Sequence, residues 1–475
     1  MSEREHLRKE LSLTSLFYLS FGTIIGVGWI TVMGSWLTDA GPIGAIGAFI
    51  VGAFVVSLIG LCYAEIGAMY PVSGGEVAYA YRMYGSPVAF LCGWLLALNY
   101  IALLGFEAIS VGWVLSAIFP GIEGPVIYTV LGSDVRLFGV LIGLGVMAAL
   151  TAIQYASVRS VDRFQSMLTI GLLGAAGIFV AAGLGLGDTG NLKPYVAETA
   201  EGGVNIAGIA ALLATTFFWF AGFDVIPQAM GERKEGAPLH LLQWVMLSSI
   251  GMALVFYVLV ILATSMAAPR DVVLSADLPV AAAFEAVLGS KLIANLVLFA
   301  GLMGLLTTWN ACFLAATRLL FSLGRAHFIP HRFAQVSVRH GTPVYAIVFA
   351  AIIGSLLSLL GRNAIGVIVN VSAISMAFVL LLITLGVAKL RRTAPDHPRP
   401  YKTPFGLTIP YAAAAGSAII LAIGFWGLLD FSNGVAFEWY ILGGWLAIGA
   451  LFWVYASGMR RKVDEKERTY LILDE

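Results

Sequence analysis

Long apolar stretches, separated by short polar or Gly- and Pro-containing segments, make up most of the chain. Each has roughly the 20 residues that a helix needs to cross a hydrocarbon core about 30 Å thick. None shows the period-two alternation of barrel strands, and lipid leaves only helices and closed barrels as spanning structures. The pattern therefore predicts an all-α polytopic membrane protein with twelve transmembrane helices, at residues 13–38, 42–69, 87–118, 137–155, 165–187, 205–230, 240–267, 291–323, 343–360, 364–388, 408–428 and 438–458.

The uneven placement of basic residues predicts how these helices are oriented. With the N-terminus inside, 22 of the 27 Lys and Arg residues fall in cytoplasmic loops and tails. Because cytoplasmic loops of membrane proteins carry such an excess, both termini are predicted to be cytoplasmic. The five basic residues left on the outer side are Arg136, Lys193, Arg270, Lys291 and Arg362.

The same pattern divides the chain into five segments. A cytoplasmic segment at 1–12 precedes a core of ten helices at 13–388. A cytoplasmic linker rich in Pro and basic residues, at 389–407, then leads to two peripheral helices at 408–458 and a cytoplasmic tail at 459–475. Within an outer loop, an apolar-periodic stretch at 281–288 predicts a short amphipathic helix.

The composition supports a membrane protein and excludes several classes of function. Hydrophobic residues make up 59% of the chain and charged residues 11%, whereas about a quarter of a soluble protein is charged. The net charge is zero, so no basic surface is available for nucleic acid. The three cysteines have no paired spacing and the six histidines have no metal spacing, so we expect no disulfide, no metal site and no cofactor. No nucleophile–base grouping indicates an enzyme.

Two of the predicted helices are interrupted near their middle. The first contains Gly22, Gly26 and Gly28, and each Gly costs about 1 kcal/mol of helix propensity relative to Ala. The sixth contains an aromatic-rich stretch at 217–224 followed by Pro227, which disrupts the helix before it. Close helix packing explains one Gly-rich helix. Two breaks five helices apart instead favour an inverted-repeat transporter, whose unwound backbone offers N–H groups to a carboxylate and carbonyl groups to an ammonium.

Four stretches resemble motifs of the amino acid–polyamine–organocation (APC) superfamily. Residues 22–28 are similar to its Gly-x-Ile-Ile-Gly-x-Gly pattern, and residues 63–79 to its Ala-Glu-Leu-(Gly/Ala) … Pro-x-Ser-Gly-Gly-x-Tyr block. Residues 220–224 resemble the aromatic-x-Gly-Phe-(Asp/Glu) motif, and residues 318–325 the Arg-x-x-x-x-(Leu/Met)-(Ala/Ser/Gly)-Arg motif. The chain is thus identified as similar to this superfamily over its first eight helices.

The resemblance implies a LeuT-like fold, in which helices 1–5 and 6–10 form inverted repeats and helices 1 and 6 are broken. It also implies a plasma-membrane permease that moves amino acids or small amines by alternating access, either as an ion-coupled symporter or as an exchanger. Its partners would be the substrate, a coupling proton or sodium ion, and the lipid bilayer. An exchanger without ion coupling, a nutrient sensor and a channel on the same fold are the alternatives.

Residue by residue, the resemblance places the substrate carboxylate at the backbone N–H groups of Gly26, Val27 and Gly28. The substrate amine would face backbone carbonyl groups, and Phe218 would be the aromatic gate. The carbonyl groups are those of Ile24, Phe218, Trp219 and Ala221.

Two positions depart from the superfamily pattern. Some proton-coupled members carry a lysine on helix 5, but the matching stretch at 163–173 offers Gly171 and Leu172, which favours sodium coupling or plain exchange. Trp29 stands where a smaller aliphatic residue is usual, and it either narrows the pocket or fills a helix interface.

Polar side chains inside the predicted helices are further candidates for coupling or for side-chain recognition. An ionised group at a helix centre costs about 2.5–3.5 kcal/mol, so Glu107 requires a reason. It either recognises a cation or carries a proton, or it is a structural acid, and the sequence favours neither. Asp224 is better explained as an acceptor for N–H groups freed by the second break than as a proton carrier. Thr307 and Thr308 either bind sodium or, more commonly, bond back to the preceding turn.

Four other residues have structural interpretations. Glu65, Arg82 and Arg318 lie at cytoplasmic helix ends, where interfacial anchoring is favoured over an inner gate of ion pairs. Phe217 is expected to face lipid.

Overall fold

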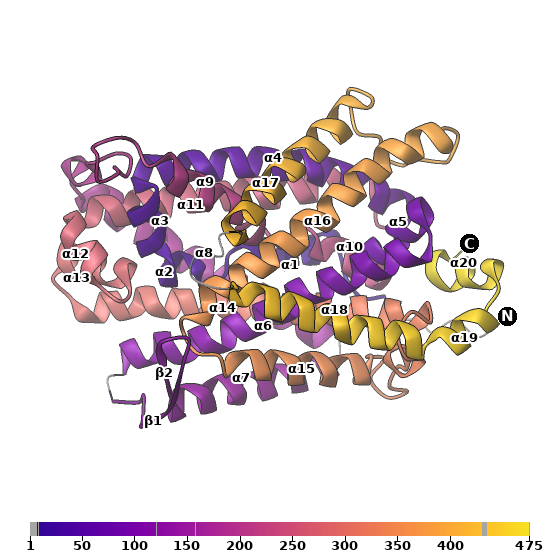
Figure 1. The fold of residues 1–475 in the computed structure, drawn as a ribbon. Helices are drawn as coiled ribbons and strands as arrows, with labels where there is room; N and C mark the ends of the chain where they lie inside the picture. Colours follow the sequence, from indigo (N-terminus) through magenta and orange to yellow (C-terminus); the bar gives the residue numbers. More distant parts are fainter. Residues whose placement is uncertain (1–6, 8, 120, 157, 430–434, 475) are drawn as a thin grey trace.

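The computed structural model of the chain describes residues 7, 9–119, 121–156, 158–429 and 435–474. Long helices run side by side through the molecule, and the described residues add one two-stranded hairpin (Figure 1). The elements are α1 Leu13–Ile24, α2 Gly28–Thr31, α3 Met33–Asp39, α4 Gly41–Met69, α5 Gly75–Tyr84, α6 Ser86–Ile118, β1 Val126–Val130, β2 Ser133–Arg136, α7 Leu137–Ala156, α8 Val158–Leu186, α9 Ile206–Trp219, α10 Val225–Ala229, α11 Leu242–Ala267, α12 Arg270–Ser275, α13 Pro279–Leu288, α14 Lys291–Arg325, α15 Val344–Ser358, α16 Ala364–Thr393, α17 Thr408–Leu428, α18 Phe437–Tyr455, α19 Ser457–Lys462 and α20 Glu465–Leu473.

Ten stretches of the described chain are helical, long and apolar enough to cross a membrane. The other two predicted spans correspond to α9 and α15, which are shorter apolar helices of 14 and 15 residues. Within the apolar 18-residue stretch of each helix, 83% of the residues are buried in α6 and 78% in α14. The corresponding share is 22% in α7 and 17% in α18. The helices α6 and α14 therefore form the centre of the bundle, where they pack against each other.

The connecting elements gather at two opposite ends of the bundle (Figure 1). The hairpin, α12 and α13 lie at one end, and α5, α19 and α20 lie at the other. The short helix expected at 281–288 is present as α13. The hairpin departs from the predicted all-helical structure, because the β-branched and aromatic run 126–130 pairs antiparallel with 133–136 across the turn at Leu131 and Gly132.

The first predicted helix is divided into separate helical pieces. Ser12 caps α1 by accepting a hydrogen bond from the N–H of Ser15, and α1 ends at Ile24. The backbone leaves helical geometry at Ile25, where φ is −93° and ψ is 79°, and α2 begins at Gly28. A side chain at Gly26 would lie 2.9 Å from the Thr308 hydroxyl, so this segment is pressed against α14.

The sixth predicted helix is divided in the same way. α9 ends at Trp219 and α10 begins at Val225. Between them Gly222 has a φ of +142°, a backbone region in which L side chains are strained. A Cβ at Gly222 would also lie 2.8 Å from the Ile24 side chain and backbone N. The second non-helical segment therefore touches the end of α1, next to the first break.

The last long helix is fastened to the centre of the bundle by two indole rings. Trp94 of α6 donates to the carbonyl of Trp445 of α18 at 2.8 Å, and Trp445 donates to the carbonyl of Trp94 at 2.7 Å. The rings stack with centroids 4.4 Å apart. Gly449 permits this approach, because a Cβ there would collide with the Trp94 ring.

The structure corrects one expectation and limits another. Phe217, expected to face lipid, is fully buried, because the last turn of α9 is enclosed by neighbouring helices although the helix begins at an exposed residue, Ile206. The cytoplasmic linker expected at 389–407 is helical at its beginning, since α16 continues to Thr393.

Candidate functional site

A small cavity of about 20 Å³ lies between the two helix breaks. Most of the backbone and side-chain positions expected at a substrate site line it, together with residues of α6, α11 and α14. The lining residues are Thr23, Ile24, Gly26, Gly28, Leu103, Phe106, Glu107, Phe218, Trp219, Ala221, Tyr257 and Thr308. Asp224 and Thr307 are not among them.

The first break presents backbone donors to this cavity. The N–H of Gly26 reaches the carbonyl of Ile24 at 3.2 Å. Among the described residues, no acceptor is found for the N–H groups of Val27 and Gly28. Since buried N–H groups are nearly always paired, the N–H of Gly28, which lines the cavity, is a candidate donor to an anionic group; Val27 is not among the lining residues.

The carbonyl groups at the ends of α1 and α9 share one hydroxyl group. Tyr257 of α11 places its hydroxyl 2.8 Å from the Ile24 oxygen and 2.9 Å from the Trp219 oxygen. A hydroxyl has one proton, so it can donate fully to only one of the two carbonyl groups at a time. Sequence reasoning missed Tyr257 because a single tyrosine in an apolar run carries no motif; the useful signal is that a buried tyrosine hydroxyl requires a partner.

Two aromatic rings from the end of α9 close over the cavity. Phe218 packs edge-on against Phe106, with ring centroids 5.6 Å apart. Trp219 covers the first break, because a Cβ on Gly28 would collide with its indole ring. Trp36 packs against Trp219 at 5.0 Å. The predicted gate residue Phe218 is therefore joined by Trp219 as a second cover.

Glu107 reaches the first break from α6. It is 1% exposed, and a Cβ at Gly26 would lie 3.1 Å from its Oε1 atom. Its Oε2 atom has no hydrogen-bond partner among the described residues. Because Glu107 lines the cavity and has an oxygen without a partner in the described chain, it can bind either a substrate group or a proton.

Asp224 accepts hydrogen bonds at the second break. Its Oδ1 atom accepts the N–H of Gly222 at 2.7 Å, and its Oδ2 atom accepts the hydroxyl of Tyr100. This is the bonding expected of an acid that satisfies the unwound backbone. It leaves Asp224 outside the lining of the cavity.

The two threonines of α14 differ in their bonding. Thr307 donates to its own helix, to the carbonyl of Gly304 at 2.7 Å. Thr308 donates across to α1, to the carbonyls of Thr23 at 2.8 Å and Gly22 at 3.3 Å. Thr308 therefore fastens the end of α1 to the central helix.

Amide side chains lie beside Gly22. One of them, Gln165, belongs to the stretch 163–173, in which a lysine was sought. A Cβ at Gly22 would lie 2.5 Å from the Gln165 amide nitrogen and 2.6 Å from the Thr169 hydroxyl. Gln165 also accepts a hydrogen bond from the Asn310 amide at 3.0 Å. Neutral amides give no comparable signal in the sequence, because only an ionised group inside a helix is costly enough to require a reason.

The other sequence candidates lie outside the cavity. Trp29 fills a helix interface, with its ring 5.3 Å from Phe179 and 5.5 Å from Phe256. Glu65, Arg82 and Arg318, the three residues considered for an inner gate, have other partners than one another in the described part of the chain. Glu65 bonds Arg391 and Arg399, Arg82 bonds the hydroxyl of Tyr70, and Arg318 bonds Glu232.

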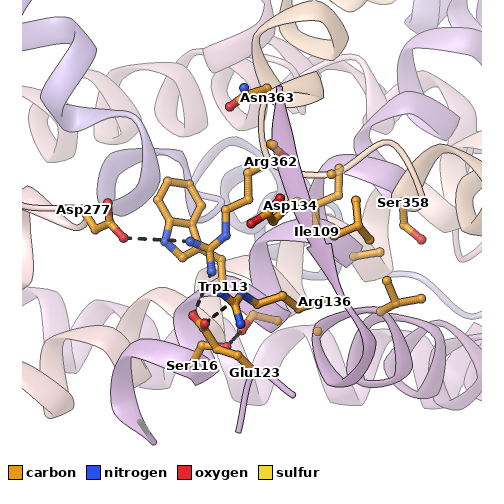
Figure 2. A pocket seen from close by; sticks show the side chains of 17 residues that line it. Ile109, Trp113, Ser116, Glu123, Asp134, Arg136, Asp277, Ser358, Arg362 and Asn363 are labelled. Carbon is orange, nitrogen blue, oxygen red and sulfur yellow. Dashed lines mark hydrogen bonds and ion pairs between the residues drawn. The ribbon is translucent and has the colours of Figure 1, made fainter. Parts of the chain in front are cut away.

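A second cavity of about 400 Å³ lies at the end of the bundle that carries the hairpin (Figure 2). Arg362, from the loop before α16, lies over the Trp113 ring at 5.0 Å and reaches Glu123 at 3.4 Å and Asp277 at 3.9 Å. Arg136 bonds the same Glu123 at 3.2 Å. The network joins α6, the hairpin and the loops before α13 and α16, and it belongs to the outer rim rather than to the central cavity.

Comparison with known proteins gives consistent matches over nearly the whole chain. A family model described as amino acid permease matches residues 11–451. The chain is 28% identical to the branched-chain amino acid permease BcaP of Bacillus subtilis, over 98% of the chain and 96% of the relative. It is 25% identical to the methylthioribose transporter of Bacillus subtilis, over 96% and 95% of the two chains. It is 27% identical to the human Asc-type amino acid transporter 1, over 89% and 79%.

Proposed function

The chain belongs to the amino acid permease family, and on that premise we propose that it is a secondary active transporter for amino acids or related small amines. It works by alternating access in the plasma (inner) membrane. Twelve helices cross the bilayer, because α9 with α10 and α15 complete the ten longer spans. Both chain termini face the cytoplasm, in accordance with the excess of Lys and Arg at that side.

The transport core comprises residues 13–388 as two inverted repeats of five helices, broken in the first and the sixth. The segments 1–12 and 459–475 are cytoplasmic tails. The segment 389–407 is the cytoplasmic linker, and 408–458 holds the two peripheral helices. The support for this arrangement is the position of the two helix interruptions, five spans apart and in contact at Gly222 and Ile24.

The substrate binds between the two interruptions. Its carboxylate accepts hydrogen bonds from the N–H groups of Gly26, Val27 and Gly28. Its ammonium donates to the backbone carbonyl groups of Ile24, Phe218, Trp219 and Ala221. The observation that carries this proposal is the juxtaposition of unpaired N–H groups with two carbonyls that share the single hydroxyl of Tyr257.

Phe218 is the gate that closes over bound substrate, and Trp219 supports it on the side of α2. Both rings move for substrate to enter, because they cover the cavity in this conformation. Glu107 and Thr308 face the substrate directly, while Asp224 and Thr307 act from behind the cavity wall. Glu107 is the candidate for recognising the substrate or its accompanying ion, since its Oε2 atom is free to bond.

The names of the relatives define the substrates to test. They include a branched-chain amino acid permease, an Asc-type amino acid transporter and a methylthioribose transporter. We expect the purified protein in proteoliposomes to exchange at least one radiolabelled amino acid of a proteinogenic panel against the same unlabelled compound inside. Methylthioribose serves as the comparison that lacks both amine and carboxylate.

Counterflow of this kind separates the rival functions. A carrier shows saturable, temperature-sensitive counterflow, a channel equilibrates substrate without counterflow, and a sensor binds substrate without moving it. An absence of saturable flux for every amino acid and amine in the panel would refute the transport proposal. Gly26→Val, which fills the space next to Thr308 and Glu107, should abolish counterflow, whereas Gly47→Val, which meets open space, should not.

A further inference from the structure

Five acidic side chains of the described chain are at most 1% exposed, and they form two groups. Glu65 and Glu232 have cationic partners, since Arg399 lies 3.2 Å from Glu65 and Arg318 lies 2.7 Å from Glu232. The other group has no lysine or arginine within ion-pair distance among the described residues; it consists of Glu76, Glu107 and Asp224. Glu107 and Asp224 belong to the central site, so Glu76 is the one that the proposed function leaves unused.

Glu76 lies in the first turn of α5 and is 0% exposed. Its Oε2 atom accepts a hydrogen bond from the amide of Gln228 in α10. The hydroxyl of Tyr63 and the backbone N–H of Glu76 itself also face this carboxyl group. Neutral donors are poor compensation for a buried negative charge, whereas a protonated carboxyl group needs no cation.

Gln228 connects Glu76 to the second helix break. Its amide nitrogen also lies 3.5 Å from the carbonyl oxygen of Asp224, one helical turn earlier. The titratable groups that face Glu76 are Tyr63 of α4, Tyr79 of α5, Cys92 and Tyr100 of α6, and Asp224. Burial, and then the negative charge of Asp224, raise the pKa of Glu76 well above its ordinary value. A buried carboxyl group with a second acid nearby and no cation beside it favours the protonated form.

The route from Glu76 to the cytoplasmic face is short. The turn before α5 packs tightly on the end of α10, because a Cβ at Gly231 would collide with the hydroxyl of Ser73 and a Cβ at Gly75 would lie 2.6 Å from Pro227. A small cavity of about 100 Å³ opens beside this contact and is lined by Ser73 and Gly231. If α10 moves away from α5, water from this cavity reaches Glu76.

We propose that Glu76 is a proton-binding residue of the transport cycle and that the coupling ion is a proton. This inference rests on the proposed transport function. In the closed state the carboxyl group of Glu76 holds the proton. When α10 separates from α5, the proton passes from Glu76 to cytoplasmic water, and the ionised carboxylate is then solvated. Substrate and proton thus leave on the same side.

The test compares two fluxes in proteoliposomes loaded with a pH-sensitive dye. The first is counterflow of a radiolabelled amino acid mixture without any gradient. The second is accumulation of the same mixture under an inward proton gradient of one pH unit, which can support up to about tenfold accumulation per coupled proton. We expect the wild-type protein to show both, with acidification of the lumen on adding substrate outside.

Glu76→Gln keeps an oxygen that accepts from Gln228 but cannot release a proton. We expect it to retain counterflow within about twofold and to lose both gradient-driven accumulation and substrate-evoked acidification. Glu438→Gln is the matched control, because it converts another buried glutamate with an amide partner, Asn370, and should leave both fluxes unchanged. Glu76→Asp keeps a titratable group and should retain accumulation with a displaced pH profile.

Each outcome decides something. Gradient-driven accumulation by Glu76→Gln at the wild-type level would overturn the inference and make Glu76 a structural acid. Wild-type counterflow without any accumulation would also overturn it, while the transport function would stand. If Glu76→Gln fails to fold, unaltered pH dependence of accumulation in Glu76→Asp refutes the inference by itself. Absence of wild-type counterflow would instead count against the proposed function.

Discussion

The hydroxyl group of Tyr257 lies 2.8 Å from the carbonyl oxygen of Ile24, at the residue where α1 ends. The same hydroxyl lies 2.9 Å from the carbonyl of Trp219, where α9 ends. One side chain of α11 thus bonds to both interrupted helices. The two carbonyl groups that it reaches are among those that we assign to the substrate ammonium, and its single proton serves one of them at a time.

Tyr257→Phe should therefore destabilise the empty protein more than the loaded one. Removing the hydroxyl leaves the buried Trp219 carbonyl without a donor and the Ile24 carbonyl with only the N–H of Gly26, and an unsatisfied buried group costs about 1–3 kcal/mol. Bound ammonium restores the donor, so we expect substrate to raise the unfolding temperature more in this variant than in the wild type. Tyr128→Phe is the control, because its hydroxyl bonds the Leu359 carbonyl in the outer hairpin. Equal thermal shifts in wild type and Tyr257→Phe would contradict the assignment.

Gly28→Ala should weaken transport with little effect elsewhere. The added Cβ collides with the Trp219 indole ring, and overpacking of this kind costs about 1–3 kcal/mol. Since the methyl group also displaces the N–H groups of the first break, we expect KM for the best amino acid to rise about tenfold or more, 1.4 kcal/mol being a factor of ten. Gly174→Ala, on α8, meets open space and serves as the control. An unchanged KM in Gly28→Ala would show that the substrate binds away from the first break.

Arg318 and Glu232 should stabilise the protein only when both are present. Both side chains are 1% exposed, and Glu232 also accepts, through its carbonyl, the N–H groups of Glu10 and Leu11. Arg318→Met leaves a buried carboxylate without its cation, which destabilises a protein by about 3–5 kcal/mol. Adding Glu232→Gln should recover part of that loss in thermal unfolding of the purified protein. If the double variant is less stable than Arg318→Met, the two groups do not act as a pair. The exposed pair of Lys9 with Glu235 is the comparison, and its removal should have no measurable effect.

Transport should not require sodium. The hydroxyl of Thr308 already donates to the carbonyls of Gly22 and Thr23, and the Gln165 amide occupies the space beside Gly22. Replacing sodium with choline on both sides of the membrane should leave uptake unchanged within about twofold. A steep dependence of uptake on sodium would refute this prediction. It would also show that the proton is not the only coupling ion. Lithium and potassium salts provide the controls for ionic strength.

Arg362→Ala should loosen the outer rim without unfolding the protein. Its side chain is 35% exposed, so its pairs with Glu123 and Asp277 contribute little to stability. They do join the loop before α13 to the loop before α16 (Figure 2). We expect faster hydrogen–deuterium exchange in residues 270–288 and unchanged exchange in α20. Unchanged exchange at 270–288 would show that this loop is held by its apolar contacts instead.

The helix interruptions could be predicted from the sequence because glycine and proline weaken helices wherever they occur. Gly26 and Gly28 mark positions at which backbone rather than side chain faces the cavity, and Gly222 marks the close contact of the second break with α1. The apolar lengths of the spans follow from the thickness of the bilayer in the same direct way. Local chemistry was sufficient for these features.

Features that depend on tertiary packing could not be predicted. Tyr257 and Gln165 lie in ordinary apolar runs, and only the packing of α11 and α8 brings them to α1. Glu76 stands inside a recognisable motif at 71–79, which reads as a loop, and its burial depends on α10. Phe217 was assigned to lipid because helix orientation around its own axis has no local determinant when nearly every position is apolar.

The two indole hydrogen bonds between Trp94 and Trp445 make α18, although it lies at the rim, a support of the central helix α6. Truncating the chain before α18 would strip a central helix of an acceptor, a donor and a stacked ring at once. A minimal transporter cut from this chain at the end of the ten-helix core would therefore need a replacement for Trp94, such as Leu, before it could be expected to assemble.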